Sequence, residues 1–298
     1  MDIFLTGGSG FVGRALCRVL IGRGHSVKCL VRVGSEHRLL ESPLIKPVPG
    51  DLLNSAQLAE LIPGCGAVIQ LVGIIREFPA KGITFNSVHR DTTISIVAAC
   101  QKAGIKRYLH MSANGTRDHA HTAYHRTKWQ AEETVRNSDL DWTIFRPSLI
   151  YGEEDQFITM ISGLIRKLPL VPVIGDGSYR LQPVPVETIA AGFANALSRP
   201  KTIGKIYHCG GADCLSYDQL LDEVGRALGK PKVRKLHHPL ALMEPLVELL
   251  QHLAIFPLTS GQLKMLLEGN CCDNTDWLED LDLTETSIRK GFEYLKQQ

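Results

Sequence analysis

The sequence predicts an α/β fold, a doubly wound parallel β-sheet with a smaller, mostly helical C-terminal lobe. Two observations lead to this prediction. Short apolar runs alternate with amphipathic segments over the first half of the chain, which is typical of β-α-β units. A glycine-rich turn also follows the first apolar run and opens the first helical segment. Together these features favour a nucleotide-binding sheet of the Rossmann type.

The glycine-rich turn predicts a bound dinucleotide. Ile3–Leu5 is expected to be a buried strand, and a helix is expected directly after the turn. Between them, Gly7, Gly10 and Gly13 match the spacing G-x-x-G-x-x-G. Counting from Gly8 instead, the run also matches G-x-G-x-x-G. Such a turn lets the backbone approach a pyrophosphate, which the N-terminus of the helix then holds.

The other elements follow the same alternation. The strands and helices expected next are 26–31, a strand ending near 49, 55–61, 67–72, 85–103, 107–111, 122–135, 142–145, 156–167, 181–184, 186–197, 205–209 and 217–228. In the helix 85–103, the apolar spacing predicts that Val88, Ile94, Val97 and Ala98 face the core. We expect a dinucleotide-binding domain at 1–150, with an interleaved segment at about 178–210, and a substrate or partner lobe at 151–298.

Composition excludes several classes of protein. Hydrophobic residues make up 44% of the chain and charged residues 21%, and the net charge of +2 gives no basis for nucleic-acid binding. No apolar run reaches the roughly 18 residues of a membrane span, and no signal or transit peptide precedes the first strand. The cysteines show neither a C-x-x-C pair nor zinc spacing, and Cys271-Cys272 is interpreted as incidental. We therefore expect reduced thiols, a cytoplasmic location and no metal.

The end of the second strand predicts which dinucleotide is bound. An acid at that position binds the 2′-hydroxyl of NAD, whereas a basic residue suits the 2′-phosphate of NADP. The strand ends in Arg32 without an acid, so we expect NADP(H) rather than NAD(H), with a solvated surface arginine as the alternative. Asp51, after the third strand, is a candidate partner of the adenine edge, and an ordinary turn residue is the alternative.

Tyr124 and Lys128 have the spacing Y-x-x-x-K on a predicted helix. Residues at this separation share a helix face. An ammonium group beside a phenol lowers the phenol's pKa from about 10, and a phenol tuned in this way can exchange the proton that accompanies hydride transfer. Because the helix follows the fifth strand of a nucleotide-binding sheet, we interpret the pair as catalytic.

These features together resemble the short-chain dehydrogenase/reductase superfamily, of the extended or atypical, epimerase/dehydratase-like type. The residues that carry the resemblance are Thr6–Gly13, Gly50-Asp51, Tyr124 with Lys128, and Arg146–Gly152. Shorter words, among them Leu71–Ile74, Tyr151–Phe157 and Gln182–Val184, are similar to the group that contains the 39-kDa accessory subunit of mitochondrial complex I and its bacterial relatives.

The resemblance implies a place for each matched residue. Gly7, Gly10, Phe11, Val12 and Gly13 would hold the pyrophosphate, Arg32 the 2′-phosphate, Asp51 and Leu52 the adenine, and Val72 and Gly73 the side of the adenosine ribose. Tyr124 would be the acid/base, Lys128 would hold the nicotinamide ribose, and Pro147 would pack near the nicotinamide ring.

The chain departs from the superfamily at customary catalytic positions. Ala113 stands where a serine or threonine is usual, and Ser112, one residue earlier, is the remaining candidate for that catalytic role. Neighbours on a strand point to opposite faces, so Ser112 needs a local twist to reach the site. His89 stands where an asparagine is usual. Losing one oxyanion donor typically costs about 10²-fold in rate, so weak or narrow catalysis and a purely structural NADPH are both compatible with the pattern.

The stretch Pro239–Leu258 is very apolar, with one polar stripe formed by Glu244, Glu248 and His252. One interpretation is a helix that packs on the core of the second lobe. The other is an apolar surface for a membrane or a lipid-like ligand, which the subgroup's association with respiratory membranes and quinone biosynthesis supports by analogy.

Three functional hypotheses follow. The leading one is an NADP-dependent oxidoreductase acting on a carbonyl or hydroxyl carbon of a small, apolar, quinone- or lipid-related substrate. The alternative is a non-catalytic NADPH-binding assembly or stability factor of a respiratory or quinone-biosynthesis complex, peripheral to the inner membrane. A sugar-nucleotide epimerase or dehydratase is less favoured because of Ala113. The pattern leaves open whether the chain is an enzyme, which substrate it takes and how it oligomerises.

Overall fold

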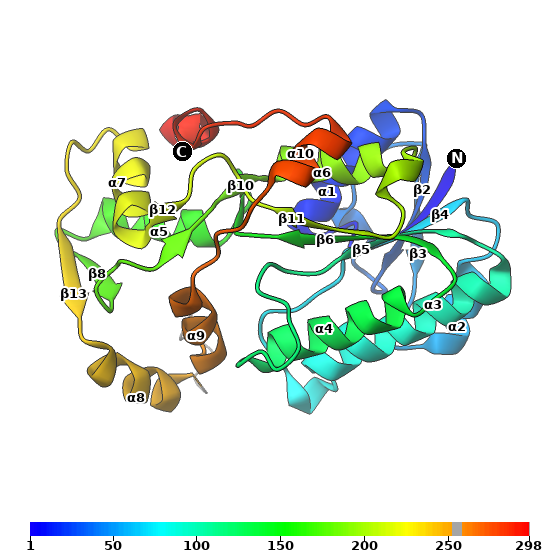
Figure 1. Ribbon diagram of the computed structural model, residues 1–298, viewed down its shortest axis with the longest axis horizontal. Helices are drawn as coiled ribbons and strands as arrows, with labels where there is room; N and C mark the ends of the chain where they lie inside the picture. The colour runs from blue at the N-terminus through cyan, green and yellow to red at the C-terminus, as the bar shows by residue number, and fades with distance from the viewer. Residues whose placement is uncertain (252–257, 298) are drawn as a thin grey trace. The chain divides into compact units, whose positions relative to one another are not determined.

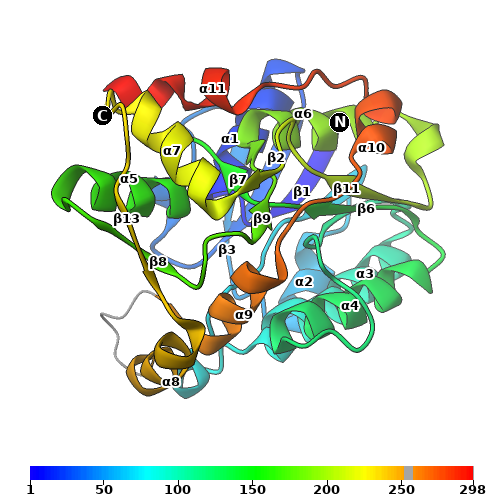
Figure 2. The same cartoon turned by 60° about the vertical axis from the view of Figure 1, so that its left-hand side comes forward.

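The computed structural model describes residues 1–251 and 258–297. The chain divides into two compact units, each assembled from three segments. Unit 1 consists of Met1–Pro147, Val186–Cys209 and Asn274–Thr284. Unit 2 consists of Ser148–Pro185, Gly210–Asp273 and Glu285–Gln298. Figures 1 and 2 show the elements of each unit along the chain.

Unit 1 is built on a seven-stranded sheet in which every neighbouring pair is parallel, with the order β11-β6-β5-β4-β1-β2-β3. Its strands are β1 (Asp2–Thr6), β2 (Ser26–Val31), β3 (Ile45–Pro49), β4 (Ala67–Gln70), β5 (Arg107–Met111), β6 (Asp141–Pro147) and β11 (Lys205–Cys209). The strand order reverses between β1 and β4, which is where ligands bind in sheets of this kind. The predicted doubly wound parallel fold is confirmed.

Helices cover both faces of this sheet (Figure 1). The helices of unit 1 are α1 (Phe11–Gly22), α2 (Ser55–Leu61), α3 (Thr92–Ala103), α4 (Ala123–Arg136), α6 (Val186–Ala196) and α10 (Thr275–Leu281). On one face α1 packs on α6, and α6 on α10; on the other α2, α3 and α4 pack in a row. Phe4, Val68 and Tyr108 of the sheet are fully buried in the core beneath α2 and α3. Short 3₁₀ turns occur at Glu36–Arg38, Pro79–Lys81 and Pro200–Thr202.

A π-helical segment, Asn86–Asp91, precedes α3 and changes which residues face the core. Ile94 is 46% exposed, whereas Val97, Ile96 and Cys100 are buried. The prediction was therefore wrong for Ile94 and Ala98, which are exposed, and correct for Val88 and Val97. A π turn has wider hydrogen-bond spacing than an α turn, so it shifts the phase of the helix that follows. A period of 3.6 residues counted from Phe85 cannot anticipate that shift.

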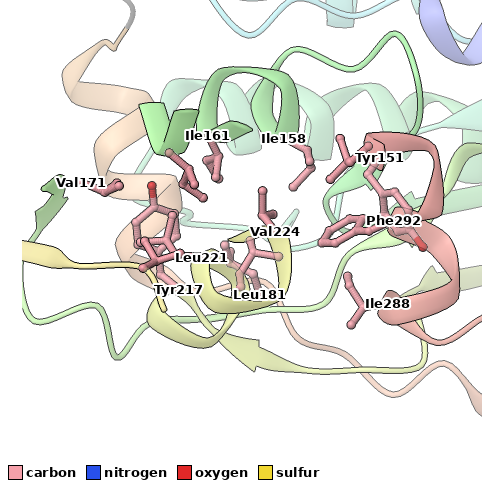
Figure 3. Close-up of a cluster of buried hydrophobic side chains, with 14 of the residues drawn as sticks. Tyr151, Ile158, Ile161, Val171, Leu181, Tyr217, Leu221, Val224, Ile288 and Phe292 are labelled. Carbon is pink, nitrogen blue, oxygen red and sulfur yellow. The ribbon is translucent and has the colours of Figure 1, made fainter. Parts of the chain in front are cut away.

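Unit 2 contains helices around short paired strands. Its helices are α5 (Phe157–Lys167), α7 (Tyr217–Ala227), α8 (Leu240–Leu250), α9 (Ser260–Glu268) and α11 (Ile288–Gly291), followed by a 3₁₀ turn at Phe292–Gln297. Its strand pairs are β7 (Ile150–Tyr151) with β10 (Val184–Pro185), β9 (Arg180–Leu181) with β12 (Leu215–Ser216), and β8 (Val171–Ile174) with β13 (Lys235–His238). The core of the unit lies between α5, α7 and the C-terminal turns, where Ile158, Val224 and Phe292 meet (Figure 3).

Unit 2 also contains a disulfide between Cys214 and Cys271, whose Cα atoms are 5.9 Å apart. The expectation of reduced thiols was therefore wrong for these two residues. They are separated by 57 positions in the sequence, and no local pattern pairs them. Cys272, next to the bridge, is a free thiol whose pKa burial raises to about 11. In the described part of the chain, no helix has the length and apolarity needed to cross a membrane.

Candidate cofactor-binding site

A pocket of about 570 Å³ lies in unit 1 beside the carboxyl ends of β1 and β4. It is lined by Thr6, Gly7, Ser9, Gly10, Phe11, Val12, Gly13, Leu30, Val31, Arg32, Ser35, Arg38, Gly50, Leu52, Leu71, Val72, Gly73, Ile75 and Met111. The glycine turn therefore faces the pocket together with Arg32, Leu52, Val72 and Gly73, as the resemblance implied.

The glycine turn is closed by its own backbone. The Gly10 amide donates to the Gly7 carbonyl at 3.0 Å, and Gly7 has a φ of +81°. A Cβ on Gly13 would lie 2.0 Å from the Gly7 oxygen, so no larger residue fits there. No side chain caps the first turn of α1 at Gly10. Its amides and the positive end of the helix dipole are thus available to an anion such as a pyrophosphate.

The adenosine side of the pocket is basic. Arg32, Ser35 and Arg38 line it, and no Asp or Glu is among the lining residues of this described pocket. Arg14 lies close enough for the charge of Arg38 to lower its pKa, after the larger effect of burial. Sequence reasoning missed Ser35 and Arg38. The segment after β2 has no periodicity that could have indicated them.

Lys128 lies at the other end of the pocket. The side chain is 2% exposed, and its Nζ donates to the carbonyl of Met111 at 2.9 Å. A Cβ on Gly73 would lie 3.1 Å from the same Nζ. Met111 and Gly73 both line the pocket, so the ammonium lies directly behind its wall. Burial lowers the pKa of Lys128 to about 8, which leaves it mostly protonated at neutral pH.

Tyr124 is half-buried near the start of α4, within a group of aromatic rings. Its ring centroid is 5.3 Å from that of His89, 5.8 Å from that of Phe85 and 5.2 Å from that of His125. Burial raises the pKa of Tyr124 to about 12. The expectation that Lys128 lowers the pKa of Tyr124 was therefore wrong, because burial disfavours the charged phenolate and raises this pKa. The phenol is protonated at neutral pH and is suited to donate a proton.

His89 connects three parts of the site. Its Nε2 accepts from the Ile74 amide at 3.1 Å, and its Nδ1 lies 2.9 Å from Thr127 Oγ1. The Thr127 hydroxyl itself donates to the carbonyls of Ala123 and Tyr124, so it accepts from Nδ1–H. The ring is then neutral, in agreement with a pKa that burial, and secondarily Lys128, lowers to about 2. His89 thus fixes the loop after β4 against the helix of Tyr124.

The remaining predicted residues do not line the pocket. Asp51 accepts from the Leu53 amide at 2.9 Å within its own turn. Pro147 is buried at the end of β6, opposite Cys209 of β11. Ser112 is 3% exposed, and its hydroxyl donates to Thr116 Oγ1 at 3.3 Å. Tyr124 and Lys128 also lie outside the lining, so the roles of all these residues stay predictions.

Comparison with known proteins agrees with this geometry. The chain matches a family described as NAD(P)H-binding over residues 7–163, and one described as RmlD substrate binding domain over residues 116–241. It is 30% identical over 304 residues to NADH dehydrogenase (ubiquinone) 1 alpha subcomplex subunit 9, mitochondrial, of Arabidopsis thaliana, covering 96% of this chain and 74% of that protein. It is 30% identical over 204 residues to ceramide reductase of Caulobacter vibrioides, covering 68% of this chain and 63% of that protein.

Solved structures share the fold. UDP-glucuronic acid 4-epimerase from Bacillus cereus, in complex with NAD, superposes with a TM-score of 0.77, covering 100% of this chain and 99% of that one. The two sequences are 18% identical, so this likeness concerns the fold alone.

Proposed function

Because this chain belongs to the NAD(P)H-binding, epimerase/dehydratase-like group of the short-chain dehydrogenase/reductase superfamily, we propose that it binds NADP(H) in preference to NAD(H). The observation that carries the proposal is the basic adenosine side of the pocket, with Arg32 and Arg38 and no acid. A guanidinium binds a phosphate well, whereas the 2′-hydroxyl of NAD is customarily bound by a carboxylate.

The pocket residues fit such a dinucleotide. The glycine turn and the first amides of α1 would hold the pyrophosphate, and Arg32 with Ser35 and Arg38 would hold the 2′-phosphate. Lys128 would hold the nicotinamide ribose from behind Gly73. Bound NADPH would supply a hydride. The chain's own part in the reaction would be to exclude water and to provide the proton.

The reaction that this arrangement supports is reduction of a carbonyl. Tyr124, protonated at neutral pH, would donate its phenolic proton to the oxygen as negative charge develops there. Lys128, charged below pH 8, would hold the nicotinamide ribose and leave the proton transfer to Tyr124. An apolar, lipid- or quinone-related substrate is our proposal, supported by the names of the relatives, a ceramide reductase and a ubiquinone-linked subunit.

A titration of both nucleotides tests the cofactor preference. We expect NADPH to bind at least tenfold more tightly than NADH, and Arg32→Ala with Arg38→Ala to remove most of that difference, since hydrogen bonds to charged groups contribute about 1.5–3 kcal/mol each. Arg18→Ala is the matched control, because Arg18 is exposed on α1 and lies outside the pocket lining. Tighter binding of NADH by the unchanged protein would refute the preference.

A second function is favoured by the incomplete catalytic set. Ala113 has no hydroxyl, and the hydroxyl of Ser112 is engaged with Thr116. These observations support a non-catalytic NADPH-binding factor of a respiratory or quinone-biosynthesis complex, located in the cytoplasm and peripheral to the inner membrane. A melting-temperature rise with NADPH, without NADPH oxidation by a panel of carbonyls and quinones, would support this function. Steady oxidation would support the reductase.

A further inference from the structure

The strands β8 and β13 of unit 2 form a two-stranded parallel ribbon (Figure 1). Leu236 of β13 is paired with Pro172 of β8. Alternate residues of a strand share a face, and Val171 and Val173 point to the core, where they are 2% and 0% exposed. Pro172 and Leu236 therefore lie on the outer face. Leu236 is 47% exposed, and Leu170, just before β8, is 46% exposed.

Basic side chains gather at the start of this ribbon. The backbone carbonyl of Arg234 accepts from the Val171 amide at 2.8 Å, and Lys230 Nζ donates to the Ile165 carbonyl, which brings the loop before β13 next to the end of α5. Lys167, Lys232 and Arg234 are exposed there. None of these three side chains has a hydrogen bond or an ion pair with a residue that the structure describes.

A cavity of about 390 Å³ lies beside these cations. It is lined by Asp222, Arg226, Lys230, Pro231, Lys232, Val233 and Lys235. Asp222 is the single acid of this described lining and is paired with Lys235 at 2.7 Å. The cations in the lining therefore outnumber the acids, and the cavity attracts anions of the size of a phosphate group.

Helix α8 follows β13 directly along the chain (Figure 2) and exposes further leucines. Leu242, Leu246 and Leu249 occur at i, i+4 and i+7 and are 61%, 41% and 73% exposed. Val247 is buried on the opposite side of the helix. Leu240 lies 3.4 Å from the place of a Cβ on Gly175, which directly follows β8, so the start of α8 is packed against the end of the ribbon.

We propose that this leucine–cation face, consisting of Lys167, Leu170, Lys232, Arg234, Leu236, Leu242, Leu246 and Leu249, docks on the surface of an anionic lipid bilayer. The leucines would enter the boundary between headgroups and acyl chains, and the basic side chains would contact lipid phosphates. The inference names the surface for the peripheral location proposed above and rests on that location, but it does not depend on the cofactor preference.

The positive charge of the leucine–cation face favours an anionic bilayer over a second copy of the chain as its binding partner. A two-fold contact would bring the unpaired cations of both copies to the same interface, where like charges repel. An anionic bilayer instead neutralises them. Glu244 and Glu248 are exposed on the adjoining stripe of α8, outside the i, i+4, i+7 row of leucines, and stay in water when the leucines insert.

Co-sedimentation with vesicles tests the proposal on the full chain. We expect binding to vesicles of equal parts phosphatidylglycerol and phosphatidylcholine, with far weaker binding to phosphatidylcholine alone. Raising the salt to about 0.5 M should reduce it, because salt screens the charge attraction. Equal binding to both vesicles, or binding to neither, would overturn the inference.

Two paired variants locate the surface. Lys232→Glu with Arg234→Glu should weaken binding to the anionic vesicles by more than tenfold, since each cation contributes roughly fivefold. Leu242→Glu with Leu249→Glu should weaken it by a similar factor. The controls in unit 1 are Lys102→Glu and Ile94→Glu, which alter exposed residues and should leave binding unchanged. Controls that lose as much as the variants would refute the assignment to this face.

NADPH affinity and light scattering separate the remaining outcomes. All four variants should bind NADPH as the unchanged protein does, which shows that they fold. An unchanged protein that binds NADPH but no vesicle contradicts the lipid inference alone. If the leucine variant changes the oligomeric state and vesicle binding is absent, the face joins copies of the chain and the inference fails.

Discussion

The two ends of the candidate cofactor site differ in the groups that they present: backbone groups at one end and side chains at the other. At the glycine turn, the backbone forms the site: Gly7 has a positive φ, and Gly13 leaves no room for a Cβ. At the other end, the predicted groups are side chains outside the pocket lining, and burial moves their pKa values, to about 12 for Tyr124, about 8 for Lys128 and about 2 for His89. Nucleotide binding at the glycine turn should therefore be sensitive to substitutions that add atoms to the turn. The other end should be sensitive to pH, because its side chains titrate.

Of the variants, Tyr124→Phe should show the largest difference between its effect on turnover and its effect on NADPH affinity. If the chain is a reductase, turnover should fall by about 10²- to 10⁴-fold, because the proton donor is lost. NADPH affinity should change little, since the glycine turn is intact. NADPH consumption and nucleotide titration measure the two effects. Tyr179→Phe is the control, a buried tyrosine of unit 2 that should leave both unchanged. An unchanged rate in Tyr124→Phe would exclude its role.

Gly13→Ala should instead act on the glycine turn and weaken the binding of NADPH. Its Cβ would lie 2.0 Å from the Gly7 carbonyl oxygen, so the turn must move away from the pyrophosphate position. Overpacking of this kind costs up to about 3 kcal/mol, and NADPH affinity should fall by roughly 10²-fold. Gly22→Ala, at the end of the same helix, is the control, since no atom lies within 4 Å of its added Cβ. Equal affinities of the two variants would contradict the backbone account.

The pH dependence of NADPH binding tests whether Lys128 contributes to the second end of the candidate site. If Lys128 holds the nicotinamide ribose as a charged group, affinity should fall as pH rises through about 8, by up to tenfold per pH unit. Stability of the protein without nucleotide should move the other way. The unfolded lysine, with its higher pKa of about 10.4, binds more protons between these two pKa values, so the free energy of unfolding rises with pH there.

Lys128→Met provides the control for both measurements. It should flatten the affinity profile above neutral pH and remove the rise in stability that Lys128 contributes. Titration calorimetry and denaturant unfolding over the same pH range read the two effects separately. An affinity that stays constant through pH 8 in the unchanged protein would show that Lys128 does not contact the nucleotide as a charged group.

The smallest effect is expected from His89→Ala. The Ile74 amide would lose its acceptor, and unfolding should become easier by about 1 kcal/mol. Turnover should fall only a few-fold, because His89 positions the loop and the helix rather than donating the proton. His89→Asn should recover part of the loss, whereas exposed His37→Ala should cost nothing. A collapse of turnover as deep as that of Tyr124→Phe would assign His89 a direct part in the chemistry.

Much of unit 1 could be predicted because its signals are local. The turn from β1 to α1 depends on glycines within one short run, and the bounds of α2 and β5 follow from adjacent apolar residues. Ser35 and Arg38 were missed because a loop has no periodicity that marks a binding residue. The pKa of Tyr124 could not be predicted either, since it depends on how deeply the packed rings bury the phenol.

Unit 2 was less predictable because its pairings are distant in sequence. β8 lies in a proline-rich stretch that reads as a loop, and it becomes a strand only by pairing with β13. The bridge between Cys214 and Cys271 likewise joins segments with no common pattern. Within Pro239–Leu258, α8 exposes Leu242, Leu246 and Leu249 and buries Val247, whereas His252 lies outside the described residues. Both interpretations of this stretch therefore stay open.

The third segment of unit 1, Asn274–Thr284, determines which truncations and recombinations of the coding sequence leave unit 1 complete. Trp277 is 1% exposed and fills the space left by Gly192, and Asp280 pairs with Lys205 and Tyr207. A premature stop codon anywhere before Asn274 therefore deletes part of the nucleotide-binding unit, although it falls long after the glycine turn. The alternation of the two units along the chain also limits recombination between related genes. A single crossover cannot exchange unit 2, because its three segments alternate with those of unit 1 along the chain.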